Sequence, residues 1–194
     1  MKKILQLKDG ASITIRPMRK DDLARSLAFF QALPEEDRRY LRREVTSPEA
    51  VEERIKELRS GKVKRLVAIF NEEIVADGSL ELETQEWKKH MAEIRLIIAR
   101  PFQRRGLGTL MARELYLLAA RERVEVIVVK MMGPQIAARG IFKRLGFSED
   151  VILSEYVRDR GGSKQDLIVM RCNLKSLMKE MEDHLADTDW QRTR

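Results

Sequence analysis

AEIRLII at residues 92–98, followed by QRRGLG at residues 103–108, is the part of this sequence that decides the fold. The first run reads as a strand with one acidic residue. After it, apolar residues recur at helical spacing at Leu110, Met111, Leu115 and Leu118, so the glycines lie where a strand ends and a helix begins. The unpaired amides and the dipole of a first helical turn attract an anion, and glycine lets that backbone approach it closely. We therefore predict a site for a phosphorylated cofactor, with Arg104 and Arg105 pairing with phosphate oxygens.

Two well-known glycine signatures do not fit this junction. The dinucleotide fingerprint requires a third glycine at position 111, where this chain has Met, and the phosphate loop of nucleotide hydrolases requires Gly-Lys-Ser/Thr, which does not occur. The alternative without a ligand is an ordinary glycine turn between a strand and a helix.

Composition and length favour one domain. The chain has 194 residues, of which 43% are hydrophobic, and we expect a domain over residues 1–186 with a tail at 187–194. No apolar run is long enough for a membrane span or a secretory signal, so we expect a cytoplasmic protein. Cys172 is the only cysteine, and with His90 and His184 as the only histidines we expect no metal site.

The charge balance is basic. Thirty-eight Lys and Arg against 31 Asp and Glu give a net charge of +7, which would attract an anionic cofactor, an acidic protein face or nucleic acid. The basic runs 38–39, 42–43 and 62–65 mix with Glu, and we interpret most of them as solvated helical faces. Nucleic acid is disfavoured because aromatic residues make up only 6% of the chain.

Periodicity and turn residues predict alternating strands and helices. The expected strands cover residues 12–16, 65–70, 73–82, 92–98, 124–129, 151–158 and 166–172. The expected helices cover 21–30, 34–43, 47–60, a segment from 107, 134–145 and 174–186. The order strand, helix, strand, helix after residue 92 implies a parallel pair within an α/β layer.

Three motifs in this order resemble the GNAT superfamily of N-acetyltransferases: ITIRP at 13–17, QRRGLG at 103–108 and LGF at 145–147. The subgroup that the chain resembles most is the acetyltransferase domain of Pat-type bacterial protein lysine acetyltransferases, through AEI at 92–94 with its spacing to Gln103, LKDG at 7–10, FF at 29–30 and YLR at 40–42. The resemblance implies an α/β (α+β) fold with a mixed, largely antiparallel twisted sheet of about six to seven strands, a parallel central pair and flanking helices. It also implies acetyl-CoA as co-substrate and transfer of an acetyl group to a primary amine, a protein lysine in the first place.

The resemblance also implies roles for particular residues. Glu93 is the candidate general base, because an amine must lose its proton before it attacks a thioester; a salt bridge to Arg95 or Lys130 is the alternative. Amides of Ile97, Ile98 and Ala99 are candidate donors to the thioester oxygen. Many GNAT enzymes carry a tyrosine acid seven residues after an asparagine, and at the corresponding positions this chain has Phe142 and Gln135. The predicted cofactor-binding residues are Ile97, Ile98, Ala99, Gln103, Arg104, Arg105, Gly106, Leu107, Gly108 and Thr109.

Two other functions stay open at this point. One is acetylation of a small amine or an amino acid, and the other is a catalytically silent module that binds coenzyme A, which the absence of the tyrosine favours. We expect no nucleic acid or membrane partner, and either a monomer or a homodimer. The acceptor, the acyl-chain preference and the regulation do not follow from the sequence.

Overall fold

The first five strands form an antiparallel run, in which three α-helices lie between the second and third strands along the chain. The computed structural model describes residues 2–176. In it, β1 (Lys3–Gln6), β2 (Ser12–Pro17), β3 (Val63–Phe70), β4 (Glu73–Leu82) and β5 (Met91–Ile98) pair in this order. Asn71 and Glu72 join β3 to β4 with φ values of 47° and 68°. Two successive positive φ values are typical of a type I′ hairpin turn, which fits the two residues left between the predicted strands 65–70 and 73–82.

The last three strands complete a sheet of eight. Their bounds are β6 (Val126–Met132), β7 (Ser148–Arg158) and β8 (Lys164–Asn173), and the sheet order is β1-β2-β3-β4-β5-β6-β8-β7. Among the strands of residues 2–176, only β5 and β6 pair in parallel, so the prediction of a largely antiparallel sheet with a central parallel pair is confirmed. The described strands exceed the predicted six to seven because β1, a four-residue edge strand, is too short to show a period in the sequence.

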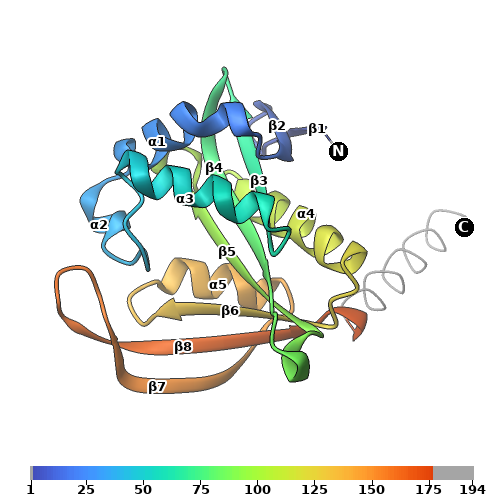
Figure 1. Ribbon diagram of the computed structural model, residues 1–194, viewed down its shortest axis with the longest axis vertical. Helices are drawn as coiled ribbons and strands as arrows, with labels where there is room; N and C mark the ends of the chain where they lie inside the picture. Colours follow the sequence, from blue (N-terminus) through green and yellow to red (C-terminus); the bar gives the residue numbers. More distant parts are fainter. Residues whose placement is uncertain (1, 177–194) are drawn as a thin grey trace, which may run out of the picture.

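Helices cover both faces of the sheet (Figure 1). Their bounds are α1 (Leu23–Ala32), α2 (Glu35–Arg38), α3 (Pro48–Arg59), α4 (Leu107–Arg121) and α5 (Ile136–Arg144), with short 3-10 turns η1 (Lys20–Asp22), η2 (Glu86–Lys88) and η3 (Arg100–Phe102). The predicted helix over 34–43 is wrong beyond Arg38, because the following residues extend toward the β7–β8 hairpin. The helix expected over 174–186 begins at Leu174, and most of it, like the tail 187–194, lies outside the described residues.

Side chains at the helix starts agree with the sequence signals. The Ser47 hydroxyl accepts a hydrogen bond from the amide of Ala50 (3.2 Å), and Pro48 occupies the first turn of α3. The Asn173 side chain accepts one from the amide of Ser176 (3.2 Å). Both contacts satisfy amides that lack a partner inside their helix.

The main apolar core lies between the sheet and α4. Leu107, Met111 and Leu115 of α4 are fully buried against it. Gly78 on β4 permits this approach, because a Cβ there would lie 3.0 Å from Cδ1 of Leu115. The helix therefore rests directly on the backbone of a central strand.

The opposite face, under α1 and α3, combines a smaller apolar cluster with buried ion pairs. Asp77 of β4 accepts hydrogen bonds from Arg54 of α3 (2.6 Å) and from Arg65 of β3 (3.2 Å), and all three side chains are buried. Arg65 also pairs with Glu57 at 3.0 Å. The interpretation of residues 62–65 as a solvated helical face is therefore wrong, since Arg65 lies in a strand and points inward.

Candidate active site

The sheet opens where its parallel strands separate. The β5–β6 pairing consists of Met91 with Val126, Ala92 with Ile127 and Glu93 with Val128, and it ends there although both strands continue. The remaining halves of β5 and β6 diverge, which leaves a wedge between two strands that would otherwise share hydrogen bonds. Glu93 therefore stands at the closed end of the wedge.

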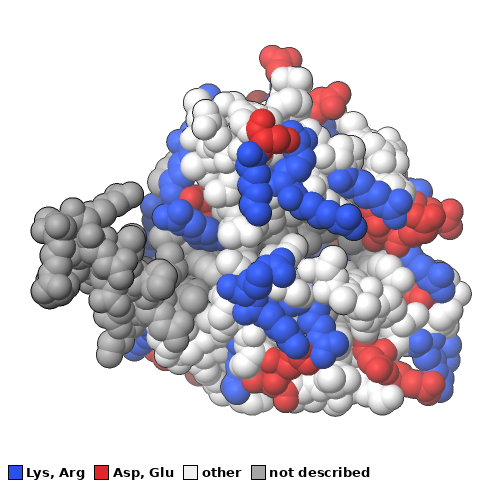
Figure 2. All heavy atoms as spheres, turned by 180° about the vertical axis from the view of Figure 1, so that it is seen from behind, with Lys and Arg blue, Asp and Glu red and all other residues white. Residues whose placement is uncertain are grey.

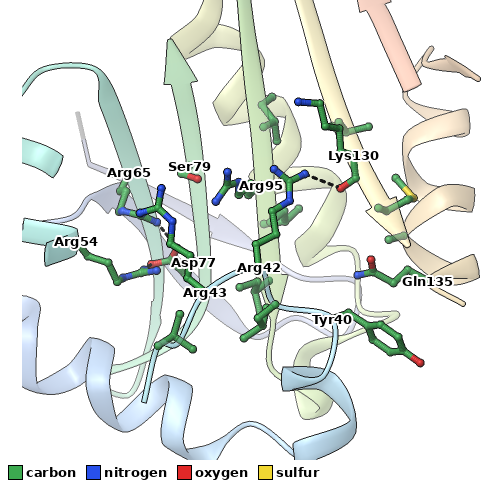
Figure 3. A pocket seen from close by; sticks show the side chains of 18 of the residues that line it. Tyr40, Arg42, Arg43, Arg54, Arg65, Asp77, Ser79, Arg95, Lys130 and Gln135 are labelled. Atoms are coloured by element: carbon green, nitrogen blue, oxygen red, sulfur yellow. Dashed lines mark hydrogen bonds and ion pairs between the residues drawn. The ribbon is translucent and has the colours of Figure 1, made fainter. Parts of the chain in front are cut away.

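A cavity of about 140 Å³ occupies this wedge. Ile94 and Leu96 of β5, Val129 and Met131 of β6, and Phe142 of α5 form its apolar side. Its other side is polar and includes Arg42, Arg95 and Lys130. Figure 3 shows Arg42 extending beside Arg95 toward the backbone of Lys130. The cavity thus has an apolar side and a charged side on which cations outnumber carboxylates.

The backbone of β5 offers alternate amides to the wedge. The amide of Ala99 donates to the carbonyl of Val75 (3.0 Å), so it faces β4 and is not free to bind a thioester oxygen. Because the edges alternate along a strand, the amide of Ile97 also faces β4, whereas those of Leu96 and Ile98 face the wedge. Of the three predicted donors, only Ile98 therefore has its amide on the open edge.

The glycine segment shapes the start of α4. Gly106 precedes the helix with φ of +90°, a left-handed conformation in which a residue with a Cβ would be strained. The amides of Leu107, Gly108 and Thr109 donate no hydrogen bond within residues 2–176, as expected for a first helical turn. Gly108 is packed tightly, since a Cβ there would lie 3.1 Å from Cδ1 of Ile98. These three unpaired amides lie at the start of α4, where the sequence predicts an anion cradle.

The two predicted phosphate arginines differ in their surroundings. Arg105 forms an ion pair with Asp9 in the β1–β2 turn, and its guanidinium lies 4.9 Å from the ring centroid of Phe102. The exposed side chain of Arg104 makes no ion pair or hydrogen bond within the described residues. Gln103 donates from Nε2 to the carbonyl of Ile98 (3.0 Å), which connects the loop to the end of β5. Arg104 is therefore the arginine of this loop that is free to meet a phosphate.

The β1–β2 turn supports the same loop. The amide of Lys8 donates to the carbonyl of Arg105 (3.1 Å), and the Lys8 side chain lies against Gly106. Figure 2 shows the molecule from behind, the side on which α4 lies, and Lys and Arg side chains flank a hollow near the middle of this face. An anionic ligand is electrostatically favoured there.

Glu93 is surrounded by cations. Its carboxylate pairs with Arg42, with Lys130 at 2.9 Å and with Arg95 at 3.5 Å. Burial alone would raise the pKa of this carboxyl, but the three cations outweigh burial and hold the pKa below its usual value. A general base at neutral pH is favoured by a raised pKa, so this environment supports the alternative prediction of a salt bridge to Arg95 and Lys130.

The helix after β6 carries the two departures from the GNAT pattern. Phe142 is buried and packs edge-on against Phe147, with ring centroids 5.2 Å apart. The Gln135 side chain accepts a hydrogen bond from the amide of Met132 (2.8 Å) and lines the wedge. Neither side chain supplies a proton donor of the tyrosine type.

Sequence reasoning missed the segment 39–47, which joins α2 to α3. Besides pairing with Glu93, Arg42 donates to the carbonyl of Lys130 (3.2 Å), and Arg43 pairs with Glu57. Arg39 donates to Asp159 in the β7–β8 turn at 2.8 Å. The basic runs 38–39 and 42–43 were interpreted as a solvated helical face, because nothing in their local pattern reveals that the chain leaves the helix and reaches four other elements, β5, β6, α3 and the β7–β8 turn.

The mixed sheet with one parallel pair and a helix that begins after a glycine agree with the class of acyltransferases that the resemblance implies. A family model described as the acetyltransferase (GNAT) domain matches residues 12–148, and the chain belongs to this family. It is accordingly an acyltransferase, and acetyl-CoA is its co-substrate.

Solved structures show the same fold at low sequence identity. The ribosomal-protein-alanine N-acetyltransferase from Brucella melitensis has a TM-score of 0.72 and 20% identity, with coverage of 82% of this chain and 98% of that one. The GNAT domain of S. lividans PAT has a TM-score of 0.72 and 15% identity, with coverage of 89% and 96%. RimL, a ribosomal L7/L12 alpha-N-protein acetyltransferase in complex with coenzyme A, has a TM-score of 0.74 and 15% identity, with coverage of 88% and 98%.

Curated proteins and, within the described residues, metal-ligand groups and membrane-spanning helices give negative findings. The search of curated proteins found no match to this sequence. Between residues 2 and 176, no His, Cys, Asp and Glu side chains come together in a group that could hold a metal ion. In the same range, no helix is both long and apolar enough to cross a membrane.

Proposed function

We propose that this chain transfers the acetyl group of acetyl-CoA to a primary amine of a protein, with a lysine side chain as the first choice. The observation that carries the proposal is the wedge beyond Glu93 and Val128, which opens beside the unpaired amides of Leu107, Gly108 and Thr109. The unpaired amides suit an anion, and the wedge suits a narrow ligand chain that enters between the strands.

The residues present fit acetyl-CoA, which supplies an acetyl group activated as a thioester. Arg104 and the first-turn amides of α4 would hold the pyrophosphate. The wedge-facing amides of Leu96 and Ile98 are placed to donate to an extended ligand, and that of Ile98 to a developing oxyanion. The apolar wall of the wedge would exclude water from the reacting groups.

The amine must reach this site without its proton. A free lysine amine has a pKa of about 10.4, so it is almost fully protonated at neutral pH. Arg42, Arg95 and Lys130 share Glu93, and Arg95 has Glu81 as a second partner at 2.9 Å, so three cations face two carboxylates. Nearby positive charge lowers the pKa of an amine. We propose that this cationic surface favours the neutral amine and that Glu93 positions the cations instead of removing the proton itself.

A protein lysine is favoured by the resemblance to the Pat-type subgroup and by the fold of the S. lividans PAT domain. A small amine is the alternative of the same class, and the size of the wedge cavity is compatible with it. A silent coenzyme A module is the second class of function, supported by Phe142 in the place of a proton donor.

The first experiment compares two glycine substitutions. Gly106→Val places a β-branched side chain at φ of +90° beside the anion cradle, and we expect acetyl-CoA binding to be abolished in calorimetry. Gly61→Val is the matched control, because Gly61 has φ of +71°, a Cβ there meets nothing within 4 Å, and it lies after α3. Both variants carry similar backbone strain, so only the first should lose the ligand.

Turnover is measured on the same samples as release of the coenzyme A thiol with a panel of lysine peptides, whole proteins and small amines. Binding with turnover on peptides or proteins supports the proposal. Turnover confined to small amines would mean that the acceptor is a small amine and not a protein lysine. Binding without turnover on any acceptor would favour the silent module. Unchanged affinity of a folded Gly106→Val protein would remove the glycine segment from the site.

A further inference from the structure

A second cavity adjoins the wedge on the side away from α4. Its volume is about 450 Å³, and it shares Tyr40, Leu41, Arg42, Lys130, Met131 and Gln135 with the first cavity. Its outer lining comes from Val157 to Arg160 of the β7–β8 hairpin and from Leu167. The two cavities therefore form one groove that runs from the splayed strands outward between the segment 39–47 and the hairpin.

The charge of this groove is predominantly positive. Arg42, Lys130, Arg158 and Arg160 line the outer cavity, and Asp159 is the one carboxylate that lines it. Asp159 is buried and already bonded to Arg39 (2.8 Å), so it offers little charge to a ligand. Arg42 and Lys130 share one carboxylate, that of Glu93, and Arg160 pairs with Glu44, which lines the first cavity. The floor of the groove therefore carries more cations than anions.

Among the cations of the outer cavity, Arg158 makes the fewest polar interactions. Its side chain donates to the carbonyl of Gly162 (2.8 Å) and pairs with no carboxylate within residues 2–176. It lies at the end of β7, on the rim of the outer cavity and away from the wedge. A carboxylate brought to this rim would meet an exposed guanidinium with donors to spare.

From these observations, and resting on the proposed function, we propose that the groove selects an acidic polypeptide segment as acceptor, in which carboxylates flank the reactive lysine and bind Arg158, Arg42 and Lys130. The volume of the outer cavity accommodates residues beside the lysine, which a small amine would leave unfilled. The anionic flanks compensate for bringing a cationic side chain into a cationic site. The acceptor amine itself then lies where positive charge lowers its pKa.

The test uses two peptides of equal length with one central lysine, flanked by Glu in one and by Gln in the other. With saturating acetyl-CoA at low salt, we expect kcat/KM for the Glu peptide to exceed that for the Gln peptide by about tenfold or more, with the difference shrinking as salt screens it. Binding of both peptides to the coenzyme A complex is measured in parallel by fluorescence anisotropy.

Arg158→Glu should abolish the preference for the Glu peptide while the KM for acetyl-CoA stays unchanged. Lys20→Glu is the matched control: it makes the same charge change at an exposed residue that lines neither cavity, and should keep the preference.

The outcomes separate the two proposals. Tighter binding of the Glu peptide without acetylation supports the groove and counts against the proposed activity. Equal acetylation and binding of both peptides supports the activity and overturns the groove. A raised KM for acetyl-CoA in Arg158→Glu would mean that a cofactor phosphate occupies the rim, and this also overturns the proposal.

Discussion

Replacing Glu93 by Gln tests whether this carboxylate holds the site together. The change removes one negative charge and leaves Arg42, Arg95 and Lys130 without their shared partner. Removing one partner of a buried ion pair costs about 3 to 5 kcal/mol. The Arg42 and Lys130 side chains are 33% and 36% exposed, so water can solvate them in the variant and the penalty shrinks. We expect a loss of about 2 kcal/mol in the free energy of unfolding at neutral pH.

The pH dependence gives the sign of the effect. The native pKa of Glu93 lies below its usual value of 4.5, so its contribution to stability is present above that value and is lost as the pH falls through the native pKa. The stability difference between wild type and Glu93→Gln should therefore be largest at neutral pH and shrink well below pH 4.5. Urea unfolding at neutral pH and at a pH well below 4.5 measures this stability difference. Glu86→Gln is the control, because the Glu86 side chain is 85% exposed.

Kinetics decide between the two roles of Glu93. If it positions cations, Glu93→Gln raises the KM for the acceptor and keeps the acidic limb of the pH profile of kcat/KM. A variant as stable as the wild type at neutral pH, with a kcat lowered by a factor of about 100 and the acidic limb of the profile lost, would refute this reasoning and establish the general base.

Three further predictions concern the fold and the cofactor loop. Hydrogen bonds from Arg16 (2.6 and 2.7 Å) lower the pKa of buried Asp22 to about 2, so stability should fall by about 2 kcal/mol as the pH drops from 3.8 to 2, and Asp22→Asn should flatten this part of a urea-unfolding profile. Gly78→Ala sets a Cβ 3.0 Å from Leu115 and should lower stability by about 1 to 3 kcal/mol in the same assay. Arg104→Gln should weaken acetyl-CoA binding in calorimetry by about 1 to 2 kcal/mol, with a smaller effect at high salt, and an unchanged affinity would remove Arg104 from the site.

The sequence predicted the parts of the fold that local chemistry determines. The turn at Asn71 and Glu72, the start of α3 at Ser47 and the strand-to-helix junction at Gly106 all follow from short-range rules on φ angles and unpaired amides. The ion pairs of Glu93 with Arg95 and Lys130 were also anticipated as an alternative, and Arg95 lies two positions further along β5 while Lys130 lies on the neighbouring strand β6.

The acceptor side of the site was not predictable in the same way. Arg42 and Arg158 meet one groove although 116 positions separate them in the sequence, and no periodic pattern connects them. The direction of the Ala99 amide depends on the pairing of β5 with β4, which is a property of the sheet register and not of the residue. Such contacts arise from the tertiary arrangement alone.

The bonds between the hairpin turn and the segment 39–47 have a consequence for protein engineering. Arg39 donates to Asp159 and Ser163, and Arg160 donates to the carbonyl of Arg43, while a Cβ at Gly161 would lie 3.2 Å from the Arg39 guanidinium. Replacing only the hairpin, or only the segment 39–47, with that of a relative would leave these donors and acceptors without matching partners. A chimera that aims at a new acceptor specificity should therefore exchange the hairpin and the segment 39–47 together, as one cassette.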